Sequence, residues 1–174
     1  MFEKPSEHPK LYQLYGKIHG FKEIIMNEGR SMLAQRQALI ESNDYDTKKG
    51  WKVLDLTKPE SYANAPFTFD IVRELREEGL IKGAMFSVLD ADSFIPPHTE
   101  KSRVMRFHLV CESPSQDENQ LGIRAGSEIL PFIEGCVLMF KDSVEHEVWN
   151  RTDKPRVNLV LDVIDPDFVE APKT

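Results

Sequence analysis

Apolar positions with helical spacing mark the first half of the chain. Within Phe21–Ile40 they recur about every 3.6 residues, which predicts one long helix with a buried face. A second helix is expected over Thr68–Glu78, with Thr68 capping its start and Gly79 suiting its end. The short apolar run Trp51–Leu56 between them is typical of a strand.

Short β-prone runs separated by turn residues dominate the second half. They are Ala84–Leu89, Arg103–Cys111, Gly122–Ala125, Cys136–Phe140, Glu147–Asn150 and Arg156–Ile164. Many short strands without helices between them predict an antiparallel barrel or sandwich. We therefore expect a mainly β single domain over 1–174, with a helical part at 1–50, a β-barrel core at 51–168 and a flexible tail at 169–174.

Two of the predicted strands alternate between an apolar face and a face that carries the polar side chains. The polar positions are Arg106 and His108 in the first strand and Arg156, Asn158 and Asp162 in the second. Because side chains alternate across a strand, each set shares one face. Two interpretations follow: a sheet with one solvent-exposed face, or a barrel with a polar interior whose outer face packs on the helices. The pattern alone favours the first.

Composition narrows the class of protein. The 174 residues suit one domain, and 40% apolar with 29% charged residues is typical of a soluble protein. A net charge of -7 without a basic run argues against nucleic acid or an anionic membrane as partner. No secretory signal or membrane-spanning run is visible, so we expect a cytoplasmic protein. Cys111 and Cys136 form no CxxC motif and are expected to be reduced thiols in strands.

Histidines supply the candidate chemistry. His8 and His19 lie in the polar N-terminal part and are expected at the surface, whereas the other three lie in the β half. The motif His98-Thr99-Glu100 with His146 further on is the ligand set of a 2-His-1-carboxylate site, which holds Fe(II) and leaves positions open. By itself this pattern is weak evidence for a metal site, because scattered surface histidines could produce it.

Arg156, ten residues after His146, strengthens the hypothesis. A guanidinium binds a carboxylate through two parallel hydrogen bonds, so Arg156 could hold the far end of a dicarboxylate co-substrate that chelates the iron. The alternative is an ordinary surface arginine beside Pro155.

Three segments together resemble a known family. They are FSVLDADSFIPPHT (86–99), RVMRFHL (103–109) and GCVLMFKDSVEHEVWNRTDKPRVNLVLDVIDP (135–166). The chain resembles the aspartyl/asparaginyl β-hydroxylase family of Fe(II)/2-oxoglutarate-dependent oxygenases over about 51–168, most strongly over 87–165. The resemblance implies a double-stranded β-helix, a jelly-roll or cupin-like barrel, packed on the N-terminal helices.

The resemblance also implies roles for single residues. His98 and His146 match the iron ligands, Arg156 and Ser87 match the residues that bind the distal carboxylate of 2-oxoglutarate, and Arg106 and His108 match an R-x-H pair that contacts the co-substrate near the metal. Glu100 departs from the animal enzymes, which have glycine there. It is either a third iron ligand, which the extended H-x-E geometry favours, or a residue that points to solvent.

The function implied is a dioxygenase that uses Fe(II), 2-oxoglutarate and O2. It would hydroxylate a C–H of an amino acid, of a small molecule derived from one, or of an aspartyl or asparaginyl residue. The substrate could be free, carrier-bound or protein-bound, and the enzyme a monomer or homodimer. Arg103 and Arg124 are candidates to hold a substrate carboxylate, the alternative being solvated arginines. A metal-binding cupin of another reaction class, or a non-catalytic module, is the alternative function.

Overall fold

The computed structural model describes residues 2–42, 50–100 and 103–165. Its α-helices are α1 (Tyr12–Gly20), α2 (Lys22–Ser31) and α3 (Pro66–Glu77). Its strands are β1 (Ile40–Glu41), β2 (Trp51–Asp55), β3 (Ile81–Leu89), β4 (Ser93–His98), β5 (Val104–Glu112), β6 (Leu121–Ala125), β7 (Glu128–Pro131), β8 (Val137–Lys141), β9 (His146–Asn150) and β10 (Arg156–Ile164). Short 3-10 helices are η1 (Pro5–Glu7), η2 (Pro9–Leu11), η3 (Arg36–Ala38) and η4 (Pro59–Ala63). The tail expected at 169–174 lies outside the described residues.

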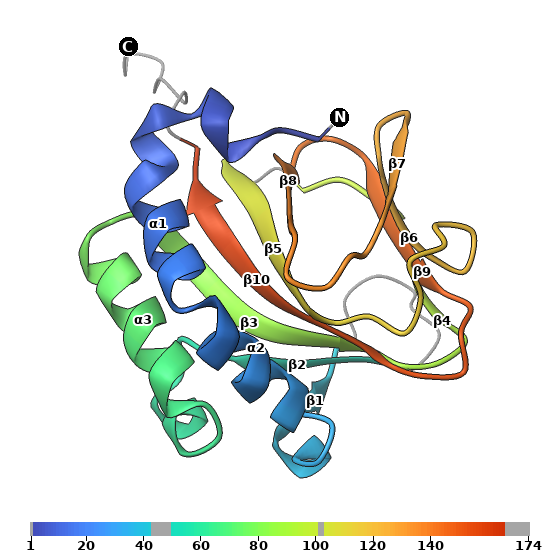
Figure 1. Cartoon of the computed structure of the whole chain (residues 1–174), viewed down its shortest axis with the longest axis horizontal. Coiled ribbons are helices and arrows are strands. Elements are labelled where there is room, and N and C mark those ends of the chain that lie inside the picture. The colour runs from blue at the N-terminus through green and yellow to red at the C-terminus, as the bar shows by residue number, and fades with distance from the viewer. Residues whose placement is uncertain (1, 43–49, 101–102, 166–174) are drawn as a thin grey trace.

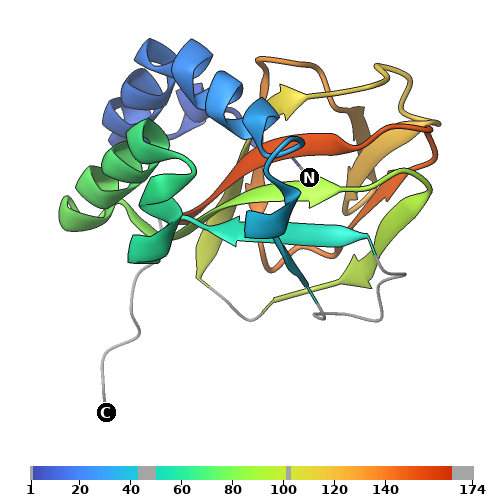
Figure 2. The ribbon, with the colours of Figure 1, turned by 90° about the horizontal axis from the view of Figure 1, so that it is seen from below.

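The strands form two antiparallel sheets. The larger has the order β1-β2-β3-β10-β5-β8 and the smaller the order β4-β9-β6-β7. Helices α1, α2 and α3 lie along one face of the larger sheet, and the smaller sheet lies across the other (Figures 1 and 2). This confirms the predicted class, mainly β in a jelly-roll arrangement with N-terminal helices. Within the described residues the two sheets share no strand pairing, so the barrel is not closed.

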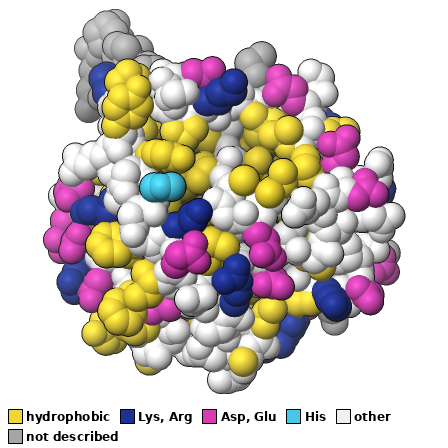
Figure 3. All heavy atoms as spheres, viewed as in Figure 1, with side chains coloured by type: hydrophobic (Ala, Val, Ile, Leu, Met, Phe, Trp, Pro, Cys, Tyr) yellow, Lys and Arg dark blue, Asp and Glu magenta, His cyan; other side chains and the backbone are white. Residues whose placement is uncertain are grey.

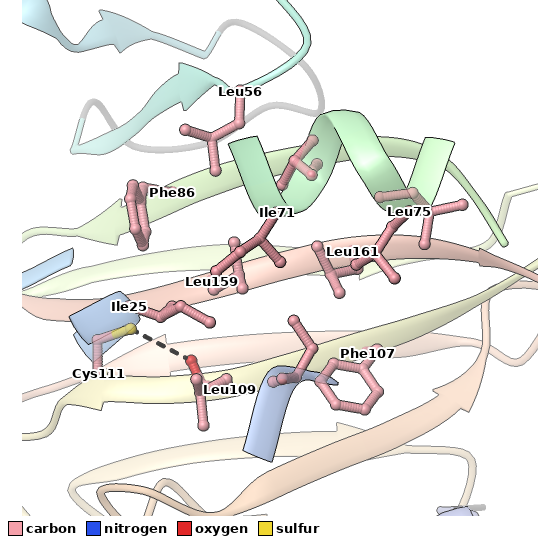
Figure 4. Close-up of a cluster of buried hydrophobic side chains, with 14 of the residues drawn as sticks. Ile25, Leu56, Ile71, Leu75, Phe86, Phe107, Leu109, Cys111, Leu159 and Leu161 are labelled. Atoms are coloured by element: carbon pink, nitrogen blue, oxygen red, sulfur yellow. Dashed lines mark hydrogen bonds between the residues drawn. The ribbon is translucent and has the colours of Figure 1, made fainter. Parts of the chain in front are cut away.

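One hydrophobic core lies between the helices and the larger sheet (Figure 4). Helix α2 lies against β5 and β10, and α3 lies against β3. The apolar positions of β5 and β10 belong to this core: Met105, Phe107, Leu109, Cys111, Val157, Leu159, Leu161 and Val163. The predicted alternation is therefore confirmed, and it is the apolar face of each strand that meets the helices.

The polar face of the same strands is enclosed as well. Arg156, Asn158 and His108 are 1%, 0% and 8% exposed, because the smaller sheet covers them. Around them lies a second core of residues from both sheets, which includes Leu89, Val110, Leu121, Ile123, Phe132, Phe140 and Val148. The interpretation with a solvent-exposed face is therefore wrong, and the interpretation with a polar interior is correct.

The single helix predicted over 21–40 is wrong. Helix α1 begins earlier and ends at Gly20, and Phe21 separates it from α2 with a non-helical φ of -107° and ψ of 12°. Helix α2 ends at Ser31, while Met32 is buried beyond that end and Ile40 is 72% exposed in β1. The helical spacing thus combined apolar residues that belong to different elements.

Helix α3 starts at Pro66, two residues before the predicted cap. The carboxylate of Glu28, on α2, accepts hydrogen bonds from the backbone N–H of Phe67 (3.0 Å) and from the N–H and hydroxyl of Thr68 (2.7 and 2.6 Å). A side chain from another helix therefore caps α3, and the predicted role of Thr68 is wrong. Gly79 does end the helix as expected, with a φ of +71°.

Two expectations about single residues need correction. His8 is 7% exposed, and its Nε2 lies 2.5 Å from Oε2 of Glu3, so its predicted surface position is wrong. His19 is exposed as predicted. Cys111 and Cys136 are both free thiols, as expected, but Cys136 precedes β8 and is exposed.

The surface mixes charges of both signs. On the face seen in Figure 1, acidic and basic side chains are interspersed, and hydrophobic side chains gather in the upper half of the view (Figure 3). No helix within the described ranges is both long and apolar enough to cross a membrane.

Candidate active site

A cavity lies between the two sheets and encloses about 490 Å³, part of which opens to solvent. The larger sheet contributes Trp51, Met85, Ser87, Arg106, His108, Phe140, Arg156 and Val160 to its wall, and the smaller sheet contributes Ile95, His98, Ile123, His146 and Val148. Six of the predicted site residues therefore meet in one cavity: Ser87, His98, Arg106, His108, His146 and Arg156.

His98 and His146 lie side by side on β4 and β9. The pairing of these strands is irregular between Ile95 and His98, where two prolines occupy the edge strand, and the irregularity puts His98 opposite His146. The ring centroids are 4.1 Å apart. Nδ1 of His98 lies 2.7 Å from the carbonyl oxygen of Pro96, and Nδ1 of His146 lies 2.8 Å from that of Val144. A proton held on each Nδ1 leaves both Nε2 lone pairs for a metal ion.

Burial keeps His146 and His108 neutral. It lowers the pKa of His146 to about 4, and the neighbouring His98 adds to this effect. Burial is also the main cause that holds the pKa of His108 well below its ordinary value, with the charges of Arg156 and Arg106 next. Neutral imidazole is the form that binds metals, so His146 needs no deprotonation to bind one at neutral pH.

Arg156 is a fully buried cation. Its Nη1 lies 3.5 Å from both the carbonyl oxygen and Oγ of Ser87, and its guanidinium carbon lies 4.9 Å from the ring centroid of Phe132. Its Nε has no hydrogen-bond partner, and within the described ranges no carboxylate forms an ion pair with it. Burial lowers its pKa to about 9, which leaves it charged at neutral pH. A buried charge without a counterion is costly, so this group is suited to an anionic ligand.

Neighbouring side chains orient the polar groups around Arg156. Nε1 of Trp51 donates to Oγ of Ser87 at 3.0 Å, so the Ser87 hydroxyl keeps its own proton for another acceptor. The amide oxygen of Asn158 accepts from Arg156 Nη1 at 3.1 Å and from His108 Nδ1 at 3.2 Å. His108 therefore carries its proton on Nδ1 and has a lone pair on Nε2.

Arg106 is held by carboxylates on two sides. Its Nε donates to Oδ1 of Asp142 at 2.8 Å, and its Nη1 donates to Oδ1 of Asp162 at 2.5 Å. Asp142 is fully buried, and its Oδ1 lies 3.8 Å from Nε2 of His146. The structure thus fixes the Arg106 guanidinium in the cavity wall next to the histidine pair.

Glu100 is not among the residues that line the cavity. Strand β4 ends at His98, and the backbone N–H of Glu100 donates to the carbonyl oxygen of Asp142 at 3.1 Å. Over the described part of the chain, no three His, Cys, Asp or Glu side chains gather closely enough to hold a metal ion. The histidine pair is therefore the candidate protein ligand set, and Glu100 as a third ligand stays a prediction.

Arg103 and Arg124 are not brought to the cavity. Arg103 is exposed just before β5. Arg124 lies on the outer face of β6, where its guanidinium pairs with Glu145 at 2.9 Å and with Glu147 at 2.5 Å. The structure therefore gives no support to their predicted contact with a substrate.

Sequence reasoning missed three residues of the site. The sequence predicts Trp51 only as the start of a strand and Asn158 only as a polar-face residue, and it gives no signal for Asp142. A signal existed for the first two, because alternation puts Trp51 on the inner face of β2 and Asn158 beside Arg156. Asp142 is separated from Arg106 by 36 residues, so only the tertiary structure reveals their contact.

Comparison with known proteins identifies the family. A family model described as aspartyl/asparaginyl beta-hydroxylase matches residues 21–166, which is most of the chain. The chain belongs to the aspartyl/asparaginyl β-hydroxylase family. The resemblance inferred from the three segments is therefore confirmed.

Curated relatives of this hydroxylase family are longer proteins. An ornithine lipid ester-linked acyl 2-hydroxylase of Rhizobium tropici is 38% identical over 84 residues, which cover 48% of this chain and 30% of the relative. Human aspartyl/asparaginyl beta-hydroxylase is 26% identical over 156 residues, which cover 84% of this chain and 20% of the relative. The chain thus spans less than a third of either relative.

A solved structure supports the fold. A prolyl-4-hydroxylase of Pseudomonas putida superposes with a TM-score of 0.58 at 14% identity, covering 82% of this chain and 87% of that chain. At this identity the likeness shows the fold alone, and it confirms the predicted double-stranded β-helix.

Proposed function

We propose that this protein is a hydroxylase that depends on Fe(II), 2-oxoglutarate and O2. The observation that carries the proposal is Arg156, a buried cation without a carboxylate partner among the described residues, in the same cavity as the adjacent pair His98 and His146. A dicarboxylate that chelates a metal at one end and needs a counterion at the other fits this combination.

The side chains present fit such a group. His98 and His146 would hold the iron through Nε2, since each Nδ1 is bound to a backbone carbonyl. Arg156 would bind the distal carboxylate of 2-oxoglutarate, and the Ser87 hydroxyl, with its proton unused by Trp51, would donate to the same carboxylate. Bound iron, 2-oxoglutarate and O2 would supply an oxidant able to hydroxylate an unactivated C–H.

The protein's own contribution is positioning and the exclusion of water. The backbone carbonyls of Pro96 and Val144 fix both imidazole rings, so the metal ligands are oriented before the metal arrives. The apolar side chains of Ile95, Ile123 and Val148 line the cavity beside them, which limits water at the reacting centre.

For the substrate we propose a C–H of an amino acid, of a molecule derived from one, or of an aspartyl or asparaginyl residue. The name of the human relative supports the aspartyl and asparaginyl part of this range. The name of the Rhizobium tropici relative places its hydroxylation on the ester-linked acyl chain of an ornithine lipid, which is a molecule derived from an amino acid. Both matches cover less than a third of the relative, so neither substrate transfers directly to this chain.

Anaerobic titration of the metal-free protein tests the proposal. Fe(II) followed by 2-oxoglutarate is expected to produce a visible charge-transfer band, which should vanish in His98→Ala and His146→Ala and weaken in Arg156→Met. Arg124→Met is the matched control, because that guanidinium lies outside the cavity, and it should keep the full band. A wild-type protein that binds neither iron nor 2-oxoglutarate, or a band that survives His146→Ala, would refute the assignment.

A further inference from the structure

A groove continues the candidate active-site cavity along the inner face of the larger sheet. It encloses about 580 Å³, including its open side, and shares Met85 and Val160 with the cavity. Its remaining lining comes from β2, β3, β10 and the turn after β2, namely Val53, Asp55, Thr57, Lys82, Gly83, Ala84 and Asp162. When one end of a substrate lies at the histidine pair, the rest of the molecule therefore has room in this groove.

The floor of the groove includes a glycine, Gly83, so no side chain fills this position. Asp55 pairs with Met85 across β2 and β3, and Asp162 pairs with Gly83 across β10 and β3. The two carboxylates thus stand on either side of β3 on the same face, and the glycine leaves the position between them empty. A Cβ atom at Gly83 would lie only 2.5 Å from Oδ2 of Asp162, so glycine is what lets this carboxylate lean over the strand.

Each carboxylate keeps one oxygen for a ligand. Oδ1 of Asp162 accepts from Arg106, and Oδ1 of Asp55 accepts from the backbone N–H and the hydroxyl of Thr57, at 2.9 and 2.6 Å. Their Oδ2 atoms accept no hydrogen bond from any residue in the described ranges. The pKa of Asp162 is raised, mainly by burial; the charge of Arg106 opposes this rise, and the charges of Asp142 and Asp55 add to it.

The two carboxylates make this groove suited to a cationic group on a ligand. Arg106 is already shared between Asp142 and Asp162, and Lys82 is an exposed side chain at the rim. A metal ion is not favoured, since no three suitable ligands gather in the described part of the chain. We propose that the groove binds the ammonium group of the substrate between Asp55 and Asp162, and so selects amine-bearing molecules. This inference rests on the proposed function for the reaction that follows binding, but not for the binding itself.

Titration of the metal-free protein with n-hexylammonium, followed by protein NMR or calorimetry at pH 7.5, tests the inference. Hexan-1-ol is the uncharged probe of equal length. We expect hexylammonium to bind about tenfold more tightly than hexanol, as a charge-assisted hydrogen bond implies. Asp55→Asn keeps an acceptor for Thr57 but removes the charge, and it should lose most of this preference.

Two further variants test whether the effect of Asp55→Asn is specific to the groove. Asp70→Asn removes an equal charge from the exposed surface of α3, where Asp70 pairs with Arg73, and should leave hexylammonium binding unchanged. Lys82→Gln removes the exposed cation at the groove and should tighten hexylammonium binding about threefold, a typical surface-charge effect. Equal affinities for hexylammonium and hexanol, or an Asp55→Asn variant that binds like Asp70→Asn, would overturn the inference.

Because these titrations need neither iron nor turnover, they separate this inference from the proposed function. A protein that binds hexylammonium as expected but shows no charge-transfer band would retain the groove and refute the oxygenase assignment. L-Lysine and dihexanoylphosphatidylethanolamine, titrated in the same way, distinguish a free amino acid from a lipid headgroup as the source of the ammonium. Binding of either that depends on Asp55 supports the inference, and binding of neither contradicts it.

Discussion

Replacement of Arg156 by methionine should stabilise the ligand-free protein, although Arg156 is among the largest fully buried side chains. Burial lowers its pKa from 12.5 to about 9. Since one pKa unit corresponds to ~1.4 kcal/mol, burying this charge costs ~5 kcal/mol. The variant also loses the hydrogen bonds to Asn158 and Ser87, each of which stabilises the folded protein by ~1 kcal/mol. We therefore expect Arg156→Met to raise the free energy of unfolding by ~1–3 kcal/mol.

Two measurements test this expectation. Urea unfolding of the metal-free protein, followed by circular dichroism, gives the change in unfolding free energy. Thermal unfolding with and without 2-oxoglutarate measures whether the variant still binds this ligand. A ligand present at about 100 times its Kd stabilises the native state by ~2.7 kcal/mol. For a chain of this size that corresponds to a rise in Tm of ~5–10 °C. The wild type should show this rise and Arg156→Met should not.

Arg124→Met serves as the control, because this arginine is paired with Glu145 and Glu147 on the outer face of β6. It should change stability by less than ~1 kcal/mol and keep the response to 2-oxoglutarate. If Arg156→Met instead destabilised the metal-free protein by more than ~2 kcal/mol, Arg156 would be a structural residue, and the argument from an uncompensated buried charge would be wrong.

Three further predictions concern stability and reactivity. Gly29→Ala should destabilise the protein by ~1–3 kcal/mol in urea unfolding, since its Cβ would lie 2.9 Å from Sγ of Cys111 and 3.0 Å from the ring of Phe86. Gly16→Ala, where nothing lies within 4 Å, should instead stabilise by ~0.5–1 kcal/mol, and equal effects of the two would contradict the packing argument. Glu28→Ala should cost ~1–2 kcal/mol of unfolding free energy because it removes the cap of α3; an unchanged urea midpoint would show that the cap adds nothing. Iodoacetamide at pH 8 should alkylate the exposed Cys136 and leave Cys111 intact in the folded protein, because burial raises the pKa of Cys111 to about 12; equal labelling by mass spectrometry would count against this.

Much of the β half could be predicted because its signals are local. The strands β5 and β10 were expected within a residue or two, since alternation and flanking turns are properties of short segments. Strands β4 and β7 were not expected, because prolines interrupt the first and the second is only four residues long. The helical half was predicted less well, because similar apolar spacing continues across the junction at Phe21 and beyond the end of α2.

The family, the β-rich fold class and the identity of the reactive groups could all be predicted, because motif order, alternation and side-chain chemistry can be read along the chain. The folded protein was needed to show that the polar face of β10 turns inward, since that depends on whether a second sheet covers it. The same holds for three other features: Arg156 forms no ion pair with a carboxylate among the described residues, Asp142 and Asp162 both bind Arg106, and Glu28 caps α3. Each joins or separates residues far apart in the chain, and local patterns carry no information on such distances.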